Sequence, residues 1–273
     1  MNVVSTEAYL TLASVAVSRW NGSAGRAHLD DVAEEVPVAL EYNGISHAVM
    51  LASPADLDDF ALGFSLSEGI IRRKDELYDC EVIAEPDGIR VALQIASARF
   101  AALKDKRRNL TGRTGCGLCG AESLQHAIRT PPAVQSSASF RPDLLQAGFQ
   151  QMERMQGLQH RTGATHAAAW LDRRGDVTLV REDVGRHNAL DKLIGAMTCA
   201  RADFATGAVL ITSRASYEMV QKAATLGIGM LAAVSAPTGL AIRLAESTGM
   251  TLAGFVRRQG HVVYAHPQRL TQS

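Results

Sequence analysis

Hydrophobic and polar positions follow different patterns in the two halves of the chain. In the first half, short β-prone runs are separated by turn residues, and we expect strands at residues 35–42, 45–51, 80–84 and 89–95. Asn43-Gly44 separates the first two runs, and an Asn-Gly pair in that position predicts a β-hairpin. Residues 54–66 have apolar positions at helical spacing, with Ser53 as the expected cap. The first half therefore predicts a small α+β unit.

The second half alternates regularly between helical and strand-like periods. Helices are expected around Leu144 to Met152 and at residues 188–197, 217–226 and 240–247. Strands are expected at residues 165–171, 177–180, 208–212, 229–234 and 252–256, with a last edge strand at 261–264. Such alternation implies a largely parallel sheet that is covered on both faces.

A segment without any packing period joins the two halves. Residues 104–108 are basic, residues 111–120 are rich in glycine, and residues 130–139 are irregular. Loops of this length are usually functional or disordered. We expect four parts: an N-terminal arm at residues 1–30, a small α+β domain at 31–105, a basic glycine-rich loop and linker at 106–140, and an α/β domain at 141–273.

The distribution of charge bears on two possible partners, nucleic acid and a membrane. Lys plus Arg and Asp plus Glu both number 28, so the net charge is zero, which argues against a broad nucleic-acid surface. The run at residues 223–242 has no charged residue and is long enough to span a membrane. Because it contains several glycines and the Ser235-Ala-Pro-Thr-Gly239 turn, it predicts buried core instead.

Thiol chemistry depends on the cellular compartment. The start of the chain has Glu7 where a signal peptide needs a basic residue, so we expect no signal peptide and a cytoplasmic location. The four cysteines are Cys80, Cys116, Cys119 and Cys199. A close pair in a reducing compartment favours catalysis or metal binding over a structural disulfide. Cys80 and Cys199 have no motif around them and are expected to be small core residues.

Cys116-Gly-Leu-Cys119 is the strongest local signal, and it has several interpretations. A zinc knuckle needs two further ligands, which the spacing of the other cysteines and histidines does not supply. A thioredoxin-type dithiol belongs at a strand-to-helix turn, whereas this pair lies in a glycine-rich loop. A persulfide carrier needs an exposed, movable and partly ionised thiol, which such a loop provides. Two incidental loop cysteines are the remaining alternative.

The residues around this pair favour the thiolate. Lys104, Lys106, Arg107, Arg108 and Arg113 bring positive charge, which lowers a thiol pKa. Lowering the pKa from about 8.5 to about 7 increases reactivity only about threefold, because nucleophilicity falls as ionisation rises. Positioning and loop movement must therefore contribute more than ionisation.

Polar residues also follow the ends of the predicted strands. In an α/β sheet, ligands bind beyond the carboxyl ends of the strands. Residues 181–187, 212–214 and 235–239 supply hydroxyls, arginines and helix N-termini, which suit phosphate groups. Ser213 and Arg214 are the candidates from this argument. Taken singly, each of these polar residues is also explained by ordinary capping and turn chemistry.

A further group follows the last long strand and comprises Phe255, Val256, Arg257, Arg258, Gln259 and Gly260. An aromatic residue and two arginines suit base stacking and phosphate binding. A hairpin turn with solvated arginines explains the same pattern.

Several long segments together resemble one known family. They are Gly115-Cys-Gly-Leu-Cys-Gly120, Thr162-Gly-Ala-Thr-His166, the run from Arg181 to Lys192, the run from Ser213 to Lys222, and Ser235-Ala-Pro-Thr238. In this order they resemble the formate dehydrogenase accessory sulfurtransferase FdhD family, from about residue 35 to residue 265.

The resemblance implies a function and a fold. Members of this family accept sulfur from a cysteine desulfurase as a cysteine persulfide. They pass it to the bis-molybdopterin guanine dinucleotide molybdenum cofactor before that cofactor enters formate dehydrogenase. The implied fold is a cytidine-deaminase-like three-layer α/β domain with a mixed sheet, plus a smaller N-terminal α+β domain. The resemblance also makes a homodimer an expectation.

The resemblance assigns roles to individual residues as well. Cys116 becomes the persulfide intermediate and Cys119 its partner, while residues 255–260 become the cofactor-binding stretch. Ser213 and Arg214 remain candidates from the strand-end argument alone. We expect no tightly bound structural metal. Two alternatives stay open: a non-enzymatic chaperone for the molybdenum cofactor, and a zinc-dependent nucleoside deaminase suggested by the fold analogy.

Overall fold

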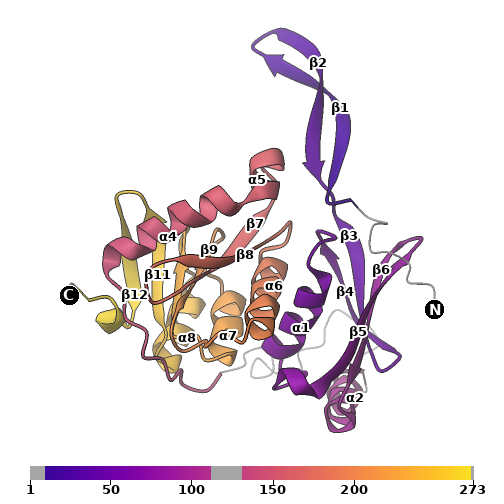
Figure 1. The fold of residues 1–273 in the computed structure, drawn as a ribbon, viewed down its shortest axis with the longest axis vertical. Helices are drawn as coiled ribbons and strands as arrows, with labels where there is room; N and C mark the ends of the chain where they lie inside the picture. Colours follow the sequence, from indigo (N-terminus) through magenta and orange to yellow (C-terminus); the bar gives the residue numbers. More distant parts are fainter. Residues whose placement is uncertain (1–9, 112–130, 272–273) are drawn as a thin grey trace.

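The computed structural model describes residues 10–111 and 131–271, with side chains described outside 106–111. Figure 1 shows two packed bodies and a narrow arm that projects from them. The described strands form a two-stranded, a four-stranded and a six-stranded sheet. The mixed α/β class predicted from the sequence is confirmed.

The N-terminal body is a four-stranded sheet with one helix packed on it. Its strands are β3 (Val36–Tyr42), β4 (Ile45–Ala52), β5 (Leu77–Glu85) and β6 (Gly88–Ile95). Their order is β4-β3-β6-β5, and both predicted hairpins are confirmed as antiparallel pairs. Alternate residues of β3 are fully buried against α1 (Leu57–Ser67), which gives this sheet its apolar face.

Ser53 does not cap α1 as we predicted. The helix begins after Asp56, whose φ of 53° places it in the left-handed region, and no side chain caps the helix. The Ser53 backbone N–H instead donates to the Asp183 carboxylate at 3.0 Å, and its hydroxyl accepts from Val184 N at 3.1 Å. Ser53 is completely buried. Through these two hydrogen bonds it joins the two bodies and does not start a helix.

The C-terminal body is a six-stranded sheet in the order β12-β11-β10-β9-β7-β8. The strands are β7 (His166–Leu171), β8 (Val177–Asp183), β9 (Ala208–Ile211), β10 (Met230–Ala233), β11 (Thr251–Arg257) and β12 (Gly260–Ala265). Strands β9, β10 and β11 are parallel to one another, whereas the β7–β8, β7–β9 and β11–β12 pairs are antiparallel. The expectation of a largely parallel sheet is therefore wrong, and the mixed sheet is correct.

Helices cover both faces of this sheet. The helices are α4 (Pro142–Met155), α5 (Gly157–Thr162), α6 (Arg186–Cys199), α7 (Tyr217–Thr225) and α8 (Gly239–Thr248). Ala168 and Trp170 of β7 face the core that α6, α7 and α8 share, while Ala169 and Leu171 face the core beneath α4. This alternation is the period of two that a strand between two layers requires. The uncharged run 223–242, which we predicted to be core, contributes β10 at the centre of the sheet.

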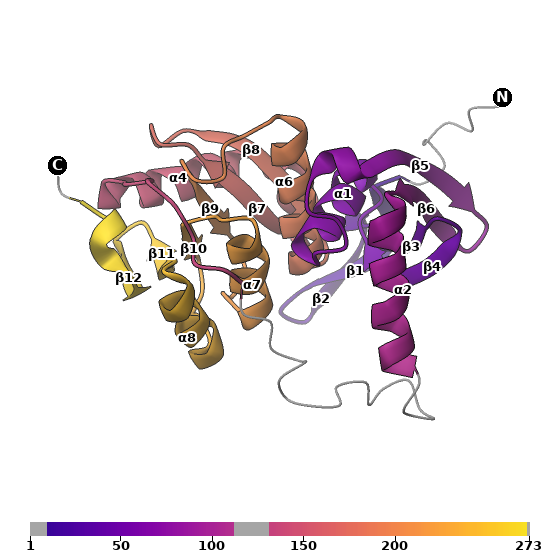
Figure 2. The same ribbon diagram turned by 90° about the horizontal axis from the view of Figure 1, so that it is seen from below.

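The two bodies meet where α1 crosses α6, and the two views place these helices side by side (Figures 1 and 2). Two glycines permit the contact. A Cβ atom added to Gly63 would lie 1.7 Å from the carbonyl oxygen of Asp191, and one added to Gly195 would lie 1.9 Å from that of Asp59. Only glycine allows backbones to approach this closely. The shared apolar core therefore runs from the first sheet through both helices to the second.

Two segments differ from the prediction of irregular chain. The arm contains an antiparallel hairpin of β1 (Leu12–Asn21) and β2 (Ala24–Ala33), which Figure 1 shows rising away from both bodies. Helix α2 (Ser97–Thr111) continues through the basic residues that we assigned to the loop. Short 3-10 turns, Lys74–Glu76 and Pro267–Arg269, complete the described elements. Within the described residues, no helix is long and apolar enough to cross a membrane.

Candidate functional site at the carboxyl end of the sheet

A cavity of about 580 Å³ lies where the three parallel strands end. Thr212 and Val234 directly follow β9 and β10, and Val256 belongs to the end of β11. Thr165 and His166, at the start of the antiparallel β7, reach the same edge. The polar residues that follow the strands therefore border a cavity at the carboxyl edge of the sheet.

Helix α4 and the chain after it form the opposite wall of this cavity. Its contributions recur at helical spacing and are Gln146, Phe149, Gln150, Met152, Glu153 and Gln156. Leu145, Phe149 and Met152 anchor the helix in the core beneath it, and each buried side chain of this size contributes roughly 1.5–3 kcal/mol. The polar members of the same helix are therefore presented to the cavity from a fixed support.

Arg257 and Arg258 line the cavity at the end of β11. The β11–β12 register shifts between Gly254 and Arg257, and Phe255 has a φ of 52°, an uncommon value for an aromatic residue. Neither arginine has an ion-pair partner among the residues that the structure describes. Two unpaired guanidinium groups beside a cavity suit an anionic ligand, since arginine binds phosphate with fork-shaped geometry.

The rest of the predicted stretch lies beside the cavity rather than in its wall. Val256, Arg257 and Arg258 are lining residues, whereas Phe255 is 39% exposed, Gln259 lies in the β11–β12 turn and Gly260 begins β12. The Phe255 backbone N–H donates to the Ser235 carbonyl oxygen at 3.2 Å, which ties this strand to the turn after β10. The predicted stretch and the predicted 235–239 turn are thus brought together.

His166 provides a neutral ring at the cavity edge. Burial lowers its pKa below the usual value, and the positive charge of Arg186 lowers it further. Its Nδ1 lies 3.4 Å from the hydroxyl oxygen of Thr212, which also accepts from Ala167 N at 2.9 Å. At neutral pH this imidazole can therefore donate or accept a hydrogen bond without adding charge.

A second hollow of about 330 Å³ adjoins the first. The two share Gln150, Glu153 and Arg258, and the second adds Arg154 and His160. Cationic and amide groups therefore continue along the outer side of α4. Because the two hollows share lining residues, together they can hold a ligand that has more than one polar portion.

Ser213 and Arg214 lie on the other side of the same sheet edge. Ser213 is buried and its hydroxyl donates to the Arg214 carbonyl oxygen at 3.0 Å, while the Arg214 side chain is exposed. Neither lines the cavity described above. The structure therefore separates these two predicted residues from residues 256–258.

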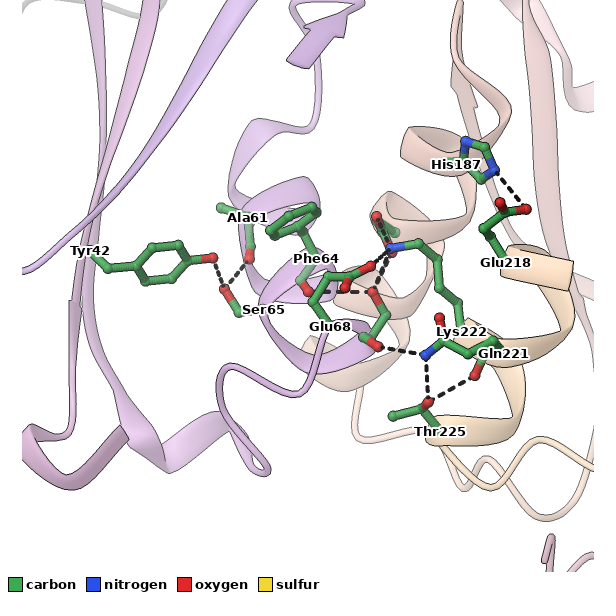
Figure 3. Close-up of polar contacts among 12 residues, drawn as sticks. Tyr42, Ala61, Phe64, Ser65, Glu68, His187, Glu218, Gln221, Lys222 and Thr225 are labelled. Carbon is green, nitrogen blue, oxygen red and sulfur yellow. Dashed lines mark hydrogen bonds and ion pairs between the residues drawn. The ribbon is translucent and has the colours of Figure 1, made fainter. Parts of the chain in front are cut away.

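Near them, His187 at the start of α6 faces Glu218 at the start of α7, with 4.0 Å between His187 Nε2 and the carboxylate (Figure 3). Burial lowers the pKa of His187, and Arg186 lowers it further. Burial alone would raise the pKa of Glu218, but its own backbone N–H and the nearby charges of His187 and Arg186 hold it below the usual value. The pair is thus largely a neutral imidazole beside a carboxylate at neutral pH.

Sequence reasoning missed a buried polar cluster at the junction of the two bodies. Lys222 Nζ lies 2.9 Å from Asp191, 2.9 Å from the Ser67 hydroxyl and 3.0 Å from Glu68, and Figure 3 shows the Lys222 side chain of α7 reaching Glu68. Burial alone would lower the pKa of Lys222, but the charges of Asp191 and Glu68 raise it. The sequence contains one sign of this cluster: Asp191 and Lys222 are charged residues within predicted helices that are otherwise largely apolar.

Cys116 and Cys119 lie outside the described residues. Of the other two cysteines, Cys80 is partly buried, and burial together with Asp58 raises the pKa of its thiol to about 12. Cys199 is exposed rather than a core residue, and its sulfur lies 3.4 Å from Lys74 Nζ. Within the part of the chain that the structure describes, no group of three or more His, Cys, Asp or Glu residues is placed to hold a metal ion.

The fold and the strand-end cavity define a mixed α/β protein with a candidate ligand site beside its sheet, and comparisons with known proteins give the family. The model described as FdhD/NarQ family matches residues 33–271. A sulfur carrier protein FdhD from Cupriavidus necator is 64% identical over 260 residues, covering 95% of this chain and 90% of the relative. Another from Bordetella petrii is 57% identical over 241 residues, covering 88% and 87%. The chain belongs to the FdhD/NarQ family.

A solved structure supports the fold independently. The crystal structure of a candidate formate dehydrogenase accessory protein from Desulfotalea psychrophila has a TM-score of 0.74 and covers 96% of this chain and 100% of its own. At 22% identity, this likeness shows the fold alone. The family resemblance inferred from the sequence motifs is confirmed.

Proposed function

We propose that this protein is a cytoplasmic sulfur carrier that serves formate dehydrogenase, with Cys116 as the residue that holds the sulfur. The proposal rests mainly on the family match, which covers residues 33–271 and includes relatives named sulfur carrier proteins. The Cys116-Gly-Leu-Cys119 pair supplies the thiols that such a carrier needs. The donor is a cysteine desulfurase. The acceptor is the bis-molybdopterin guanine dinucleotide molybdenum cofactor before its insertion into the enzyme.

The first step loads the carrier. The Cys116 thiolate attacks the outer sulfur of the desulfurase persulfide. A new S–S bond forms on Cys116, the S–S bond of the donor breaks, and the donor cysteine leaves as a thiolate that takes up a proton. The step exchanges one S–S bond for another, so no external oxidant is needed.

The second step delivers the sulfur. The Cys119 thiolate attacks Cys116 Sγ, and the terminal sulfur leaves as hydrosulfide, which becomes a ligand of the molybdenum. The two cysteines are oxidised to a disulfide while the terminal sulfur is reduced, so electrons balance. A cellular dithiol reductant then returns both cysteines to thiols.

The strand-end cavity supports the cofactor part of the proposal. Arg257 and Arg258 are available for phosphate, because neither is paired with a carboxylate among the described residues, and the cavity between them and α4 has room for a nucleotide portion. Ser213 and Arg214 remain candidates for a second contact at the same sheet edge.

Formate oxidation in cells that lack their own family member tests this function. We expect the wild-type chain to restore formate dehydrogenase activity, Cys116→Ala to abolish it, and Cys80→Ala to leave it unchanged. Activity with Cys116→Ala equal to wild type would favour the cofactor chaperone that moves no sulfur. The Cys119→Ala variant tests the delivery step separately.

A further inference from the structure

The arm hairpin is a two-stranded sheet whose outer part is covered by no segment that the structure describes. Strands β1 and β2 pair over ten residues each, and Figure 1 shows them projecting beyond both bodies. Every residue from 18 to 30 is exposed. A hairpin without a third strand or a packed helix is only marginally stable in water. The outer part of the arm therefore lacks packing that a binding partner would supply.

Trp20 and Leu29 give one face of the arm two large apolar side chains. The register pairs Trp20 with Gly25 and Ala16 with Leu29, and residues four apart on a strand share a face. The Trp20 ring lies against Gly25, since a Cβ atom added there would be 3.1 Å from the ring. Trp20 and Leu29 nevertheless remain 68% and 69% exposed. A seated tryptophan with most of its surface in water is typical of the residues that dominate protein interfaces.

Two arginines lie on the opposite face of the same tip. Arg19 pairs directly with Arg26 in the register, and neither has an ion pair or a hydrogen bond among the described residues. Like charges directly opposite each other destabilise a sheet. Because the tip supplies no countercharge, carboxylates on a partner are the groups that would offset this repulsion. Pairing with the same arm of a second copy would instead bring two more arginines to the tip.

The base of the arm is fixed to a wall of the strand-end cavity. Arg161 of α5 donates to the Asp31 carboxylate of β2 at 2.7 Å. Glu182 of β8 holds α5 in turn, since it accepts from the Gln159 backbone N–H at 2.8 Å. Gln159 itself lines the cavity. A protein that grips the arm would therefore stand beside the cavity in which the cofactor is proposed to bind.

We propose that the arm is a docking element for the enzyme that receives the cofactor, the catalytic subunit of formate dehydrogenase. Trp20 and Leu29 pack into an apolar groove on that enzyme, and the rim of the groove supplies carboxylates to Arg19 and Arg26. The position of the arm beside the cavity favours this partner over the sulfur donor, which has to reach Cys116 and not the cofactor. This inference rests on the proposed function, which names the enzyme and the cofactor.

Binding of the full-length protein to the immobilised, cofactor-free catalytic subunit of formate dehydrogenase tests the assignment. We expect Trp20→Ser to weaken this binding by at least about tenfold, because it removes the central apolar contact. Tyr78→Ser is the matched control, since its side chain is 69% exposed on β5 of the N-terminal body, and its affinity should be unchanged. Both variants should keep the wild-type melting temperature and sulfur loading, because both positions are exposed.

Charge reversal tests the two arginines. The double variant Arg19→Glu, Arg26→Glu should lose at least about tenfold in affinity at low salt, because attraction to carboxylates becomes repulsion. Its binding should also no longer weaken as salt is added. Arg174→Glu, in the exposed β7–β8 turn, is the control for a reversed charge elsewhere and should bind as the wild type does.

Wild-type affinity in Trp20→Ser would overturn this inference, and so would a wild-type protein that loads sulfur on Cys116 yet does not bind the enzyme. Loss of cysteine desulfurase binding in Trp20→Ser, with enzyme binding intact, would place the sulfur donor on the arm and overturn it as well. A change to monomer in analytical ultracentrifugation of Trp20→Ser alone would place a second copy there, with the same consequence. Sulfur loading on Cys116 is measured separately in each case, so failure of the arm assignment is distinct from failure of the carrier function.

Discussion

Lys192 Nζ lies 2.7 Å from the Asp183 carboxylate, and both side chains are completely buried. The carboxylate also accepts from Ser53 N, Gly185 N and the Asn188 amide, while Lys192 donates to the Ser53 carbonyl oxygen at 2.9 Å. Every polar group of this pair is therefore satisfied. The pair joins the end of β8, the start of α6 and the N-terminal body at a single point.

Replacing Lys192 by methionine should destabilise the protein by about 3–5 kcal/mol, because a buried carboxylate is left without its countercharge. Urea unfolding measures this loss. The matched control is Arg73→Met, which breaks an ion pair whose side chains are 73% and 67% exposed and should cost little stability, because solvent screens an exposed pair. Equal losses in the two variants would contradict a structural role for the buried pair.

Gly195→Ala should weaken the junction of the two bodies. The added methyl group would lie 1.9 Å from the Asp59 carbonyl oxygen. Because this contact is with the backbone of α1, it can be relieved only by moving α1 away from α6. We expect a loss of about 1–3 kcal/mol or more in the free energy of unfolding. Gly157→Ala in α5 meets no atom within 4 Å and should be neutral or slightly stabilising. A stable Gly195→Ala protein would show that the helices can separate freely.

Stability should fall in mild acid. The pKa values of His166 and His187 are lowered in the folded protein, chiefly by burial and then by Arg186, whereas an unfolded histidine titrates near 6.5. Below about pH 6.5 the unfolded chain binds protons that the folded chain does not, so the unfolding free energy decreases as the pH falls toward the lowered values. Urea midpoints between pH 7.5 and about 5 measure the slope, which should decrease in a His166→Gln, His187→Gln double variant. An unchanged slope would mean that other groups cause it.

Arg258→Ala should weaken the binding of a guanine nucleotide, because this arginine is proposed to bind phosphate at the strand-end cavity. A charge-assisted hydrogen bond to phosphate contributes about 1.5–3 kcal/mol, so GDP should lose roughly 10–100-fold in affinity. The salt dependence of binding should also become shallower. Arg174→Ala, in the exposed β7–β8 turn, is the control. An unchanged affinity for GDP in Arg258→Ala would contradict phosphate binding by this arginine.

The sequence predicts most of the elements because their periods are strong. Buried strands such as β9 and β10 are short apolar runs bounded by turn residues, and the Asn43-Gly44 hairpin follows from turn chemistry. The directions of the strands are harder to predict from the sequence. Strand β7 is antiparallel to β9, and this direction depends on how the two strands pair in the folded sheet. The arm hairpin has exposed residues on both faces, so it carries no clear amphipathic period.

The candidate site is less predictable than the fold. Arg257 and Arg258 follow a strand, which is a local signal. Glu153 and Gln156 carry none, since they become cavity residues only when α4 crosses the end of the sheet (Figure 1). Likewise Asp191 and Lys222 are ordinary helical charges until the two helices place them together in the core.

The most direct test of the central claim is the intact mass of the protein after incubation with a cysteine desulfurase and cysteine, followed by peptide mapping. We expect a gain of one sulfur atom located on Cys116, lost in Cys116→Ser and retained in Cys80→Ser and Cys199→Ser. A sulfur atom that remains in Cys116→Ser, or no gain at all in a folded wild-type protein, would contradict it.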